Sequence, residues 1–247
     1  MLSRSLIRFQ AILIVTLCAT AAWSARPSVC IDTLKASQLS LTAQDTDMTN
    51  MAYAVHNVGN MVFSITNAGV IGYSWTETPD YFTGLFYERG SEFPRHSMLY
   101  HTWGSQFWIG GVLDGDTLVS IAMSPSPDYY REFHADEEPF MVFETRSTGR
   151  PDLPGFDQAV SEQDIIAVYY DTLVPELSPL DFLRGTPHEP LHLEITQRSY
   201  AWSYEVASDF ILFDITLTNI GDLPINDAYF GILDQPWVGF AWDAFFA

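Results

Sequence analysis

The sequence predicts a mostly β protein of antiparallel strands, sandwich-like and low in helix. Along residues 209–220 apolar and polar side chains alternate, and the apolar set falls on one face of an extended chain: Ile211, Phe213, Ile215 and Leu217. The Asp114-Gly115 pair stands between two β-prone runs, which is typical of a tight hairpin. No segment of the sequence carries a sustained helical period with caps at its ends.

Residues 1–25 have the three parts of a secretory signal peptide. Arg4 and Arg8 precede an apolar run at residues 11–17, and small residues follow that run. The run is shorter than the ~20 apolar residues that a membrane-spanning helix needs, and no later stretch of the sequence reaches that length. We therefore expect export to the extracellular space or the cell surface, and no membrane span after signal cleavage.

Acidic residues dominate the charge of the chain. The formal net charge is −20, and removal of Arg4 and Arg8 with the signal peptide makes it two units more negative. Nucleic acid and anionic membranes are therefore excluded as expected partners. Cys30 is the only cysteine left after cleavage, so the exported part must be held together by its core and not by an internal disulfide.

The polar residues 26–54 indicate a linker or irregular segment, and residues 55–247 indicate a β-rich domain that we expect to be truncated at its C-terminal end. Its first strand is expected at residues 61–66, a β-prone run closed by the turn cluster at 67–69. Residues 72–104 mix aromatics with glycine, proline and charges, which favours a long loop. Two strands are then expected around Asp114-Gly115, at 106–113 and 116–122.

Later strands are expected where apolar runs lie between turn-forming residues. A proline-rich region separates the hairpin from the run at 165–170. A long antiparallel pair follows, residues 191–206 and 209–220, with its turn at Ala207-Ser208. A last strand is expected at 228–233, and the chain ends soon afterwards in apolar residues.

Several runs resemble a known family when they are taken in order along residues 55–235. They are Phe107-Trp108-Ile109-Gly110-Gly111, then 115–120, 161–169, 194–204 and 210–221. In this order and spacing they resemble the N-terminal region of large uncharacterised secreted bacterial proteins. The resemblance implies a module that continues into immunoglobulin-like repeats and a C-terminal type IX secretion sorting domain, and it supplies no catalytic residues.

His188-Glu189-Pro190-Leu191-His192 matches the H-E-x-x-H pattern of zinc proteases. That pattern binds zinc only when a helix brings the two histidines onto one face. Pro190 lies inside the motif, and the residues that follow alternate as in a strand. We interpret the motif as a proline-marked entry into a strand.

Acidic residues offer candidate calcium ligands at two places. Asp114 and Asp116 flank the glycine of the predicted hairpin turn, and residues 136–138 are three consecutive acids. The alternating acids and closing glutamate of a calcium loop are absent from the sequence at both places. Calcium is therefore a possible cofactor at Asp114 and Asp116, with a plain acidic turn as the alternative, and no other cofactor is expected.

Tyr200, Trp202 and Tyr204 would share one face of a strand. They are the candidate ligand-binding residues, as a flat platform for sugar rings, and the alternative interpretation is that they form part of the core. The predicted function is architecture or interaction without catalysis, in contact with other domains of a longer chain, cell-surface components or polysaccharide. Two alternatives stay open: a carbohydrate-binding module, and part of a secreted hydrolase whose catalytic residues are scattered or lie beyond residue 247.

Overall fold

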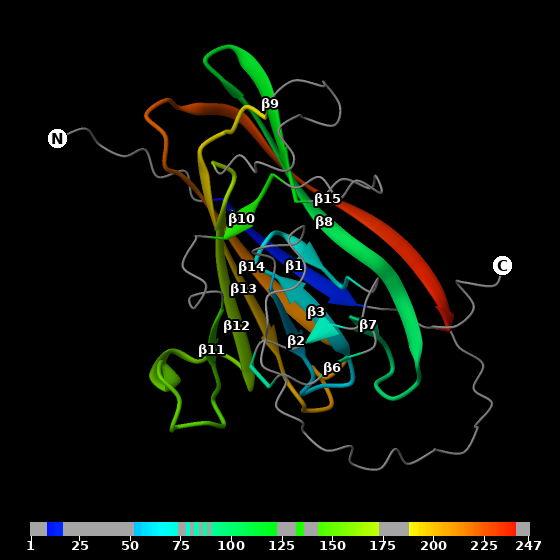
Figure 1. Ribbon diagram of the computed structural model, residues 1–247. Helices are drawn as coiled ribbons and strands as arrows, with labels where there is room; N and C mark the ends of the chain where they lie inside the picture. The colour runs from blue at the N-terminus through cyan, green and yellow to red at the C-terminus, as the bar shows by residue number, and fades with distance from the viewer. Residues whose placement is uncertain are drawn as a thin grey trace, which may run out of the picture.

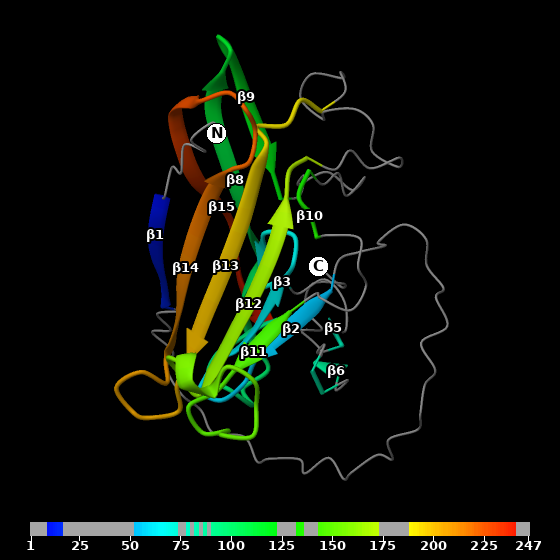
Figure 2. The ribbon, with the colours of Figure 1, turned by 90° about the vertical axis from the view of Figure 1, so that its left-hand side faces the viewer.

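A computed structural model describes residues 9–16, 52–73, 78–79, 82–83, 86–87, 90–122, 132–135, 143–172 and 188–240. These residues form two large antiparallel sheets and one short strand pair, which confirms the mostly β, antiparallel and sandwich-like prediction. Among the described residues, the only helical element is η1 (Phe156–Gln158), a single 3₁₀ turn. Figures 1 and 2 show the arrangement of the strands from two directions.

The first sheet, sheet A, is built around the predicted long antiparallel pair. Its strands, in spatial order, are β1 (Phe9–Thr16), β14 (Phe210–Asn219), β13 (Leu193–Ala201), β12 (Gln163–Tyr170) and β10 (His134–Ala135), and β11 (Glu144–Arg146) also pairs with β12. Strand β1 comes from the predicted signal peptide and lies beside β14 in both views (Figures 1 and 2).

The second sheet, sheet B, is built around two long strands. Its strands, in spatial order, are β15 (Ile225–Phe240), β8 (Leu99–Leu113), β4 (Val70–Ile71), β3 (Val62–Thr66) and β2 (Tyr53–His56). Two further strands join it, β7 (Ser91–Glu92) beside β3 and β8, and β9 (Asp116–Ile121) beside β8. The short separate pair is β5 (Thr78–Pro79) with β6 (Phe86–Tyr87). In Figure 1, β8 and β15 run together as a long curved pair along one side of the molecule.

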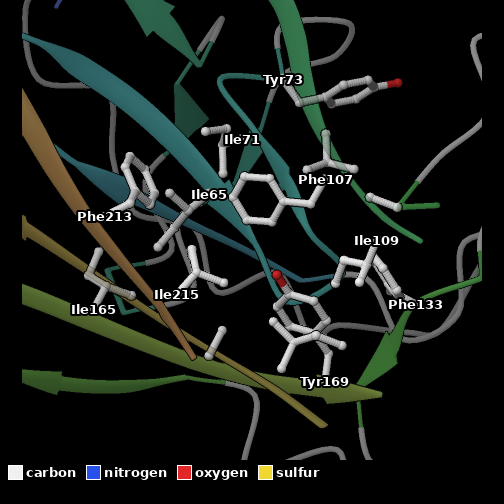
Figure 3. Close-up of a cluster of buried hydrophobic side chains, with 14 of the residues drawn as sticks. Ile65, Ile71, Tyr73, Phe107, Ile109, Phe133, Ile165, Tyr169, Phe213 and Ile215 are labelled. Carbon is white, nitrogen blue, oxygen red and sulfur yellow. The ribbon is translucent and has the colours of Figure 1, made fainter. Parts of the chain in front are cut away.

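The core lies where the inner faces of the two sheets meet. Side chains of both sheets point toward one another in Figure 3, among them Phe107 and Ile65 from sheet B and Phe213 and Ile165 from sheet A. Phe63 and Phe213 meet edge to face across the interface, with ring centroids 6.2 Å apart. The predicted alternation of β14 is confirmed, because Ile211, Phe213, Ile215 and Leu217 are all buried. The burial of this apolar surface is what drives the two layers together.

The hairpin predicted at Asp114-Gly115 is confirmed. Leu113 and Asp116 are Cα partners at its closed end, and the two turn residues have φ values of 50° and 92°. Positive φ at both central positions is the conformation that matches the twist of the flanking strands. The strands expected at 61–66, 165–170 and 209–220 are also present, and β15 extends the strand expected at 228–233 in both directions.

Two predicted boundaries are wrong. The loop expected at residues 72–104 contains β5, β6, β7 and the first part of β8. Strand β8 begins at Leu99 because β15 supplies a partner strand there. The arm expected to reach Val206 ends at Ala201, where its neighbour β12 begins at Gln163 and the ladder between them stops. Both boundaries are decided by a distant partner strand and not by local composition.

Replacing Gly115 by alanine should destabilise the fold by about 1 kcal/mol, because a side chain is strained at a φ of 92° although nothing lies within 4 Å of the added Cβ. The matched control is Gly149→Ala, whose Cβ would meet its nearest neighbour at an ordinary 3.7 Å without a positive φ. Chemical denaturation of both variants measures the difference. Equal stability of the two variants would contradict the positive-φ turn.

Candidate functional site

A buried chain of hydrogen bonds joins His56 of β2 to sheet A, and we name His56, Gln163 and Ser199 the histidine tie. Nε2 of His56 lies 2.8 Å from Oγ of Ser199, and Nδ1 lies 3.3 Å from Oε1 of Gln163. Ser199 belongs to β13 and Gln163 to β12. No local motif in the sequence identifies this set, because His56 and Ser199 are 143 positions apart.

The backbone decides which ring nitrogen of His56 carries the proton. The Nε2 amide of Gln163 donates to the carbonyl of Val55 at 2.9 Å, and its Oε1 accepts from the backbone N–H of Asn57 at 2.9 Å. The oxygen of Gln163 therefore faces His56, so Nδ1 must donate to it. Nε2 is then left to accept from the hydroxyl of Ser199 at 2.8 Å, and the same hydroxyl also lies 3.2 Å from the carbonyl oxygen of Ile165.

The histidine tie has the hydrogen-bond order of a serine–histidine nucleophile, in which a base accepts the hydroxyl proton and a third group orients the base. Its surroundings differ from those of an active site. Both His56 and Ser199 are fully buried, and the third group is a neutral amide and not a carboxylate. Burial lowers the pKa of His56 to about 3, against the opposing effect of its hydrogen bond to Gln163. His56 is thus a neutral connector between the sheets.

A second buried cluster, which we name the aspartate clasp, is centred on Asp171 directly after β12. Its Oδ2 accepts from Oγ of Ser120 at 2.8 Å and from the N–H of Leu191 at 2.7 Å, and its Oδ1 accepts from the N–H of Leu193 at 2.6 Å. Ser120 belongs to β9 in sheet B, so Asp171 links sheet A to sheet B. Through Leu191 and Leu193 it also holds the start of β13. Burial raises the pKa of Asp171, while these hydrogen bonds oppose the rise.

His188 and Glu132 extend the aspartate clasp. Nδ1 of His188 lies 3.1 Å from Oε1 of Glu132, and both side chains are almost completely buried. Glu132 also accepts the N–H of Ile121 through Oε2 at 2.7 Å. Burial acts to lower the pKa of His188, but the hydrogen bond to Glu132 and the charges of Glu132 and Asp171 outweigh it, so the pKa of His188 is raised. The raised pKa favours the charged form of His188, whose positive charge offsets the negative charge of the buried carboxylates.

The H-E-x-x-H segment forms no helix, in agreement with its interpretation as an entry into a strand. Residues 188–192 have no regular structure and lead into β13 at Leu193. His188 is buried in the aspartate clasp, whereas His192 is exposed and has a φ of 60°. In the described part of the chain, no group of three or more His, Cys, Asp or Glu side chains is arranged to hold a metal ion.

The two carboxylates singled out for calcium lie at the tip of the β8–β9 hairpin. Asp114 occupies the turn and Asp116 begins β9, and both are exposed. The described residues bring no third acidic or histidine side chain to them as a metal group. Calcium binding at Asp114 and Asp116 stays a prediction, and the acidic run 136–138 lies outside the described residues.

Tyr200, Trp202 and Tyr204 lie together, but not on one strand face. Only Tyr200 is in β13, because the strand ends at Ala201. Ring centroids are 6.4 Å apart for Tyr200 and Trp202 and 6.3 Å apart for Trp202 and Tyr204, with ring planes tilted by 31° and 57°. Phe210 joins them at 6.0 Å from Trp202. The tilted packing is that of a small local core, with Tyr204 half exposed, and sugar binding by these three residues stays a prediction.

A groove on the outer face of sheet B was not recognised in the sequence. It has a volume of about 260 Å³ and is lined by Trp108, Gly110, Gly111, Val112, Thr117, Leu118, Val119, Asp227, Tyr229 and Gly231. Tyr229 of β15 is Cα partner to Gly110 of β8, and Trp108 is partner to Gly231. Each aromatic residue therefore stands beside a glycine, which has no side chain to cover it; Tyr229 is exposed and Trp108 is partly buried. The sequence predicted a strand over the Trp108-Ile109-Gly110-Gly111 run, but it did not indicate that β15 would be the partner strand.

Comparisons of this chain with protein-family models, with curated proteins and with solved structures find no match. Within the ranges that the structure covers, no helix is long and apolar enough to cross a membrane.

The histidine tie should make stability depend on pH in a defined direction. The folded state holds His56 neutral with a pKa of about 3, against 6.5 when the histidine is free. The unfolded chain therefore binds a proton that the folded chain does not, and stability falls as the pH drops from 6.5 toward 3, by on the order of 4 kcal/mol from this group.

The measurement is the free energy of unfolding of the wild type and of His56→Gln at several pH values. The slope between pH 6.5 and 3 should be smaller in His56→Gln than in the wild type, and His96→Asn, which removes an exposed histidine, is the matched control. An unchanged slope in His56→Gln would show that His56 is not held neutral.

Replacing Asp171 by alanine should destabilise the fold by roughly 3 kcal/mol, because three donors in and around the aspartate clasp lose their acceptor. Asp152→Ala is the control, since Asp152 is an exposed carboxylate paired with Arg150 and its loss should change the stability far less. Urea denaturation near neutral pH compares the two. A cost for Asp171→Ala as small as that of the control would contradict the clasp.

Proposed function

We propose that the chain is an exported binding module, without a catalytic step of its own, that binds its ligand in the groove on the outer face of sheet B. The observation that carries the proposal is the exposure of Tyr229 there, beside the partly buried Trp108. Tyr229 is 71% exposed although it lies in the middle of a long strand. Gly110 and Gly231 flank the two aromatic residues of the groove without covering them. Exposed aromatic faces in a concavity are typical of binding sites.

The chemistry of the groove favours a neutral polysaccharide. Aromatic rings offer flat apolar faces to the C–H groups of sugar rings, and the Asp227 carboxylate at the groove can accept hydrogen bonds from hydroxyl groups. A formal charge of −20 repels acidic polysaccharides and nucleic acids. A glycan without charge offers C–H and hydroxyl groups to these side chains and is not repelled by the negative charge of the chain.

The hydrolase alternative has one specific observation in its favour, the serine–histidine order of the histidine tie. Attack on a substrate requires the hydroxyl of Ser199 to reach a carbonyl carbon, but Ser199 has no exposed surface and lies between the sheets. His188 and Glu132 are likewise buried. These positions support binding over hydrolysis as the function of the described residues.

The proposal places the module outside the cell. The signal peptide features of residues 1–25 and the acidic charge support export, and the family resemblance supports a position at the N-terminal end of a longer surface protein. Other domains of that chain and cell-surface components would then be its neighbours.

Tyr229→Ala and Trp108→Ala should each weaken binding to a neutral polysaccharide by roughly tenfold, because each removes one stacking face. Affinity electrophoresis in gels that contain soluble cellulose derivative, mixed-linkage glucan or galactomannan measures the effect. Tyr204→Ala is the matched control, since it removes an equally large exposed ring from the hairpin end of β13.

Gly231→Val tests the same groove without removing a ring. An added Cβ at Gly231 would meet its nearest neighbours at 3.8 Å, so the fold should tolerate the change while the groove is filled. Binding should be lost and the midpoint of denaturation retained. If Tyr204→Ala abolishes binding and Gly231→Val does not, the ligand lies on the Tyr200–Trp202–Tyr204 cluster and not in the groove. If the protein is retarded by no neutral polysaccharide, the proposed class of ligand is wrong.

A further inference from the structure

One edge of sheet A is closed by the predicted signal peptide. Strand β1 pairs with β14 in an unbroken antiparallel register that runs from Phe9 opposite Leu217 to Thr16 opposite Phe210. The other side of β14 pairs with β13. Cleavage of the signal peptide would therefore leave the backbone N–H and C=O groups along residues 210–217 without a partner on one side, while the strand itself stays fixed in the sheet.

This edge differs from the other sheet edges of the same molecule. Strand β15, which ends sheet B, carries an exposed Asp227 at a φ of 46°, register shifts in its pairing with β8, and Pro236. Bulges, charges and prolines are the devices by which natural edge strands resist pairing with other chains. The other edges are shorter, with four residues in β2, six in β9, two in β10 and three in β11.

Strand β14 carries only one of these devices, the charged residue Asp214. It has ten residues, it contains no proline or lysine, and its pairing with β1 shows no shift in register. Its residues alternate between buried and half-buried along the whole length, as in an interior strand. The strand is therefore built to have a neighbour on both sides, although the neighbour it has belongs to a segment that export is expected to remove.

We propose that signal cleavage opens the edge of β14 as an acceptor for an extended strand of another polypeptide, which adds to sheet A antiparallel to β14 in the place of β1. This inference rests on the proposed export and is independent of the groove in sheet B. Addition of a strand to an open sheet edge gives affinity through the main chain and specificity through alternate side chains.

The register defines the chemistry of the incoming strand. The residues opposite the inward-facing Ile211, Phe213 and Ile215 are Val15, Leu13 and Ala11, so apolar residues are required at alternate positions of about eight. A second copy of this chain is disfavoured as the occupant, because two copies with a formal charge near −20 repel each other. The strand that fits is apolar at every second residue and uncharged or basic elsewhere.

The test uses the processed chain, purified after export, and a synthetic peptide with the sequence of residues 9–16 carrying a basic solubility tag. Mass spectrometry first shows whether residues 9–16 have been removed.

The peptide should then bind with a stoichiometry of one peptide per chain, and hydrogen exchange of the backbone amides along residues 210–217 should slow about tenfold. The same peptide N-methylated at alternate residues should bind roughly tenfold more weakly, because it cannot complete the ladder. Tyr229→Ala should bind the peptide as the wild type does, which separates this site from the groove.

Three results would overturn the proposal. The first is an exported chain that retains residues 9–16, since β14 then never loses its partner. The second is a processed chain that binds no peptide and forms a dimer protected along residues 210–217, which would make a second copy the occupant. The third is a monomer that binds no peptide, which would show that the open edge accepts no strand.

Discussion

The pairing of polar groups between the two sheets is the constraint on which the rest of the structure depends. A sandwich of this kind is expected to have an apolar interior, and a polar group placed there must find a partner or cost several kcal/mol. The histidine tie meets this requirement without charge, because Gln163 accepts from His56 and His56 accepts from Ser199. The aspartate clasp meets it with charge, through three donors to Asp171 and the His188–Glu132 pair. Each set fixes one sheet against the other at a defined position, which apolar packing alone does with less precision.

The residues whose types suggest catalysis are the ones that pair inside the fold, whereas the residues that can contact a ligand lie on the surface. Serine and histidine side chains lie together twice between the sheets, with Gln163 in the histidine tie and with two carboxylates in the aspartate clasp, and both sets hold the fold. The exposed features are of another kind: aromatic rings beside glycines on the outer face of β8 and β15, and the backbone edge of β14. Both favour binding. They lie on different sheets, so a glycan in the groove and a strand on the edge would not compete for one surface.

Features set by neighbours in sequence were the ones that the sequence predicted well. The Asp114-Gly115 hairpin and the buried face of β14 follow from turn chemistry and from an alternation of period two, and both are confirmed. The start of β8 and the end of β13 were predicted wrongly, because partner strands β15 and β12 decide them. The histidine tie and the groove escaped prediction for the same reason: each joins residues that are distant in the chain, and neither Ser199 nor Tyr229 stands in a recognisable motif.

The most direct test of this account is the protonation of His56 in the folded protein, followed by ¹⁵N and ¹H NMR of the imidazole ring through a pH titration. If His56 is a buried neutral connector, its ring should stay uncharged from neutral pH down toward its pKa of about 3, with the proton on Nδ1 throughout. If instead the ring titrates near 6.5 with the protein still folded, His56 is accessible to solvent. The Ser199–His56 pair would then have to be treated as a catalytic dyad and not as a tie between the sheets.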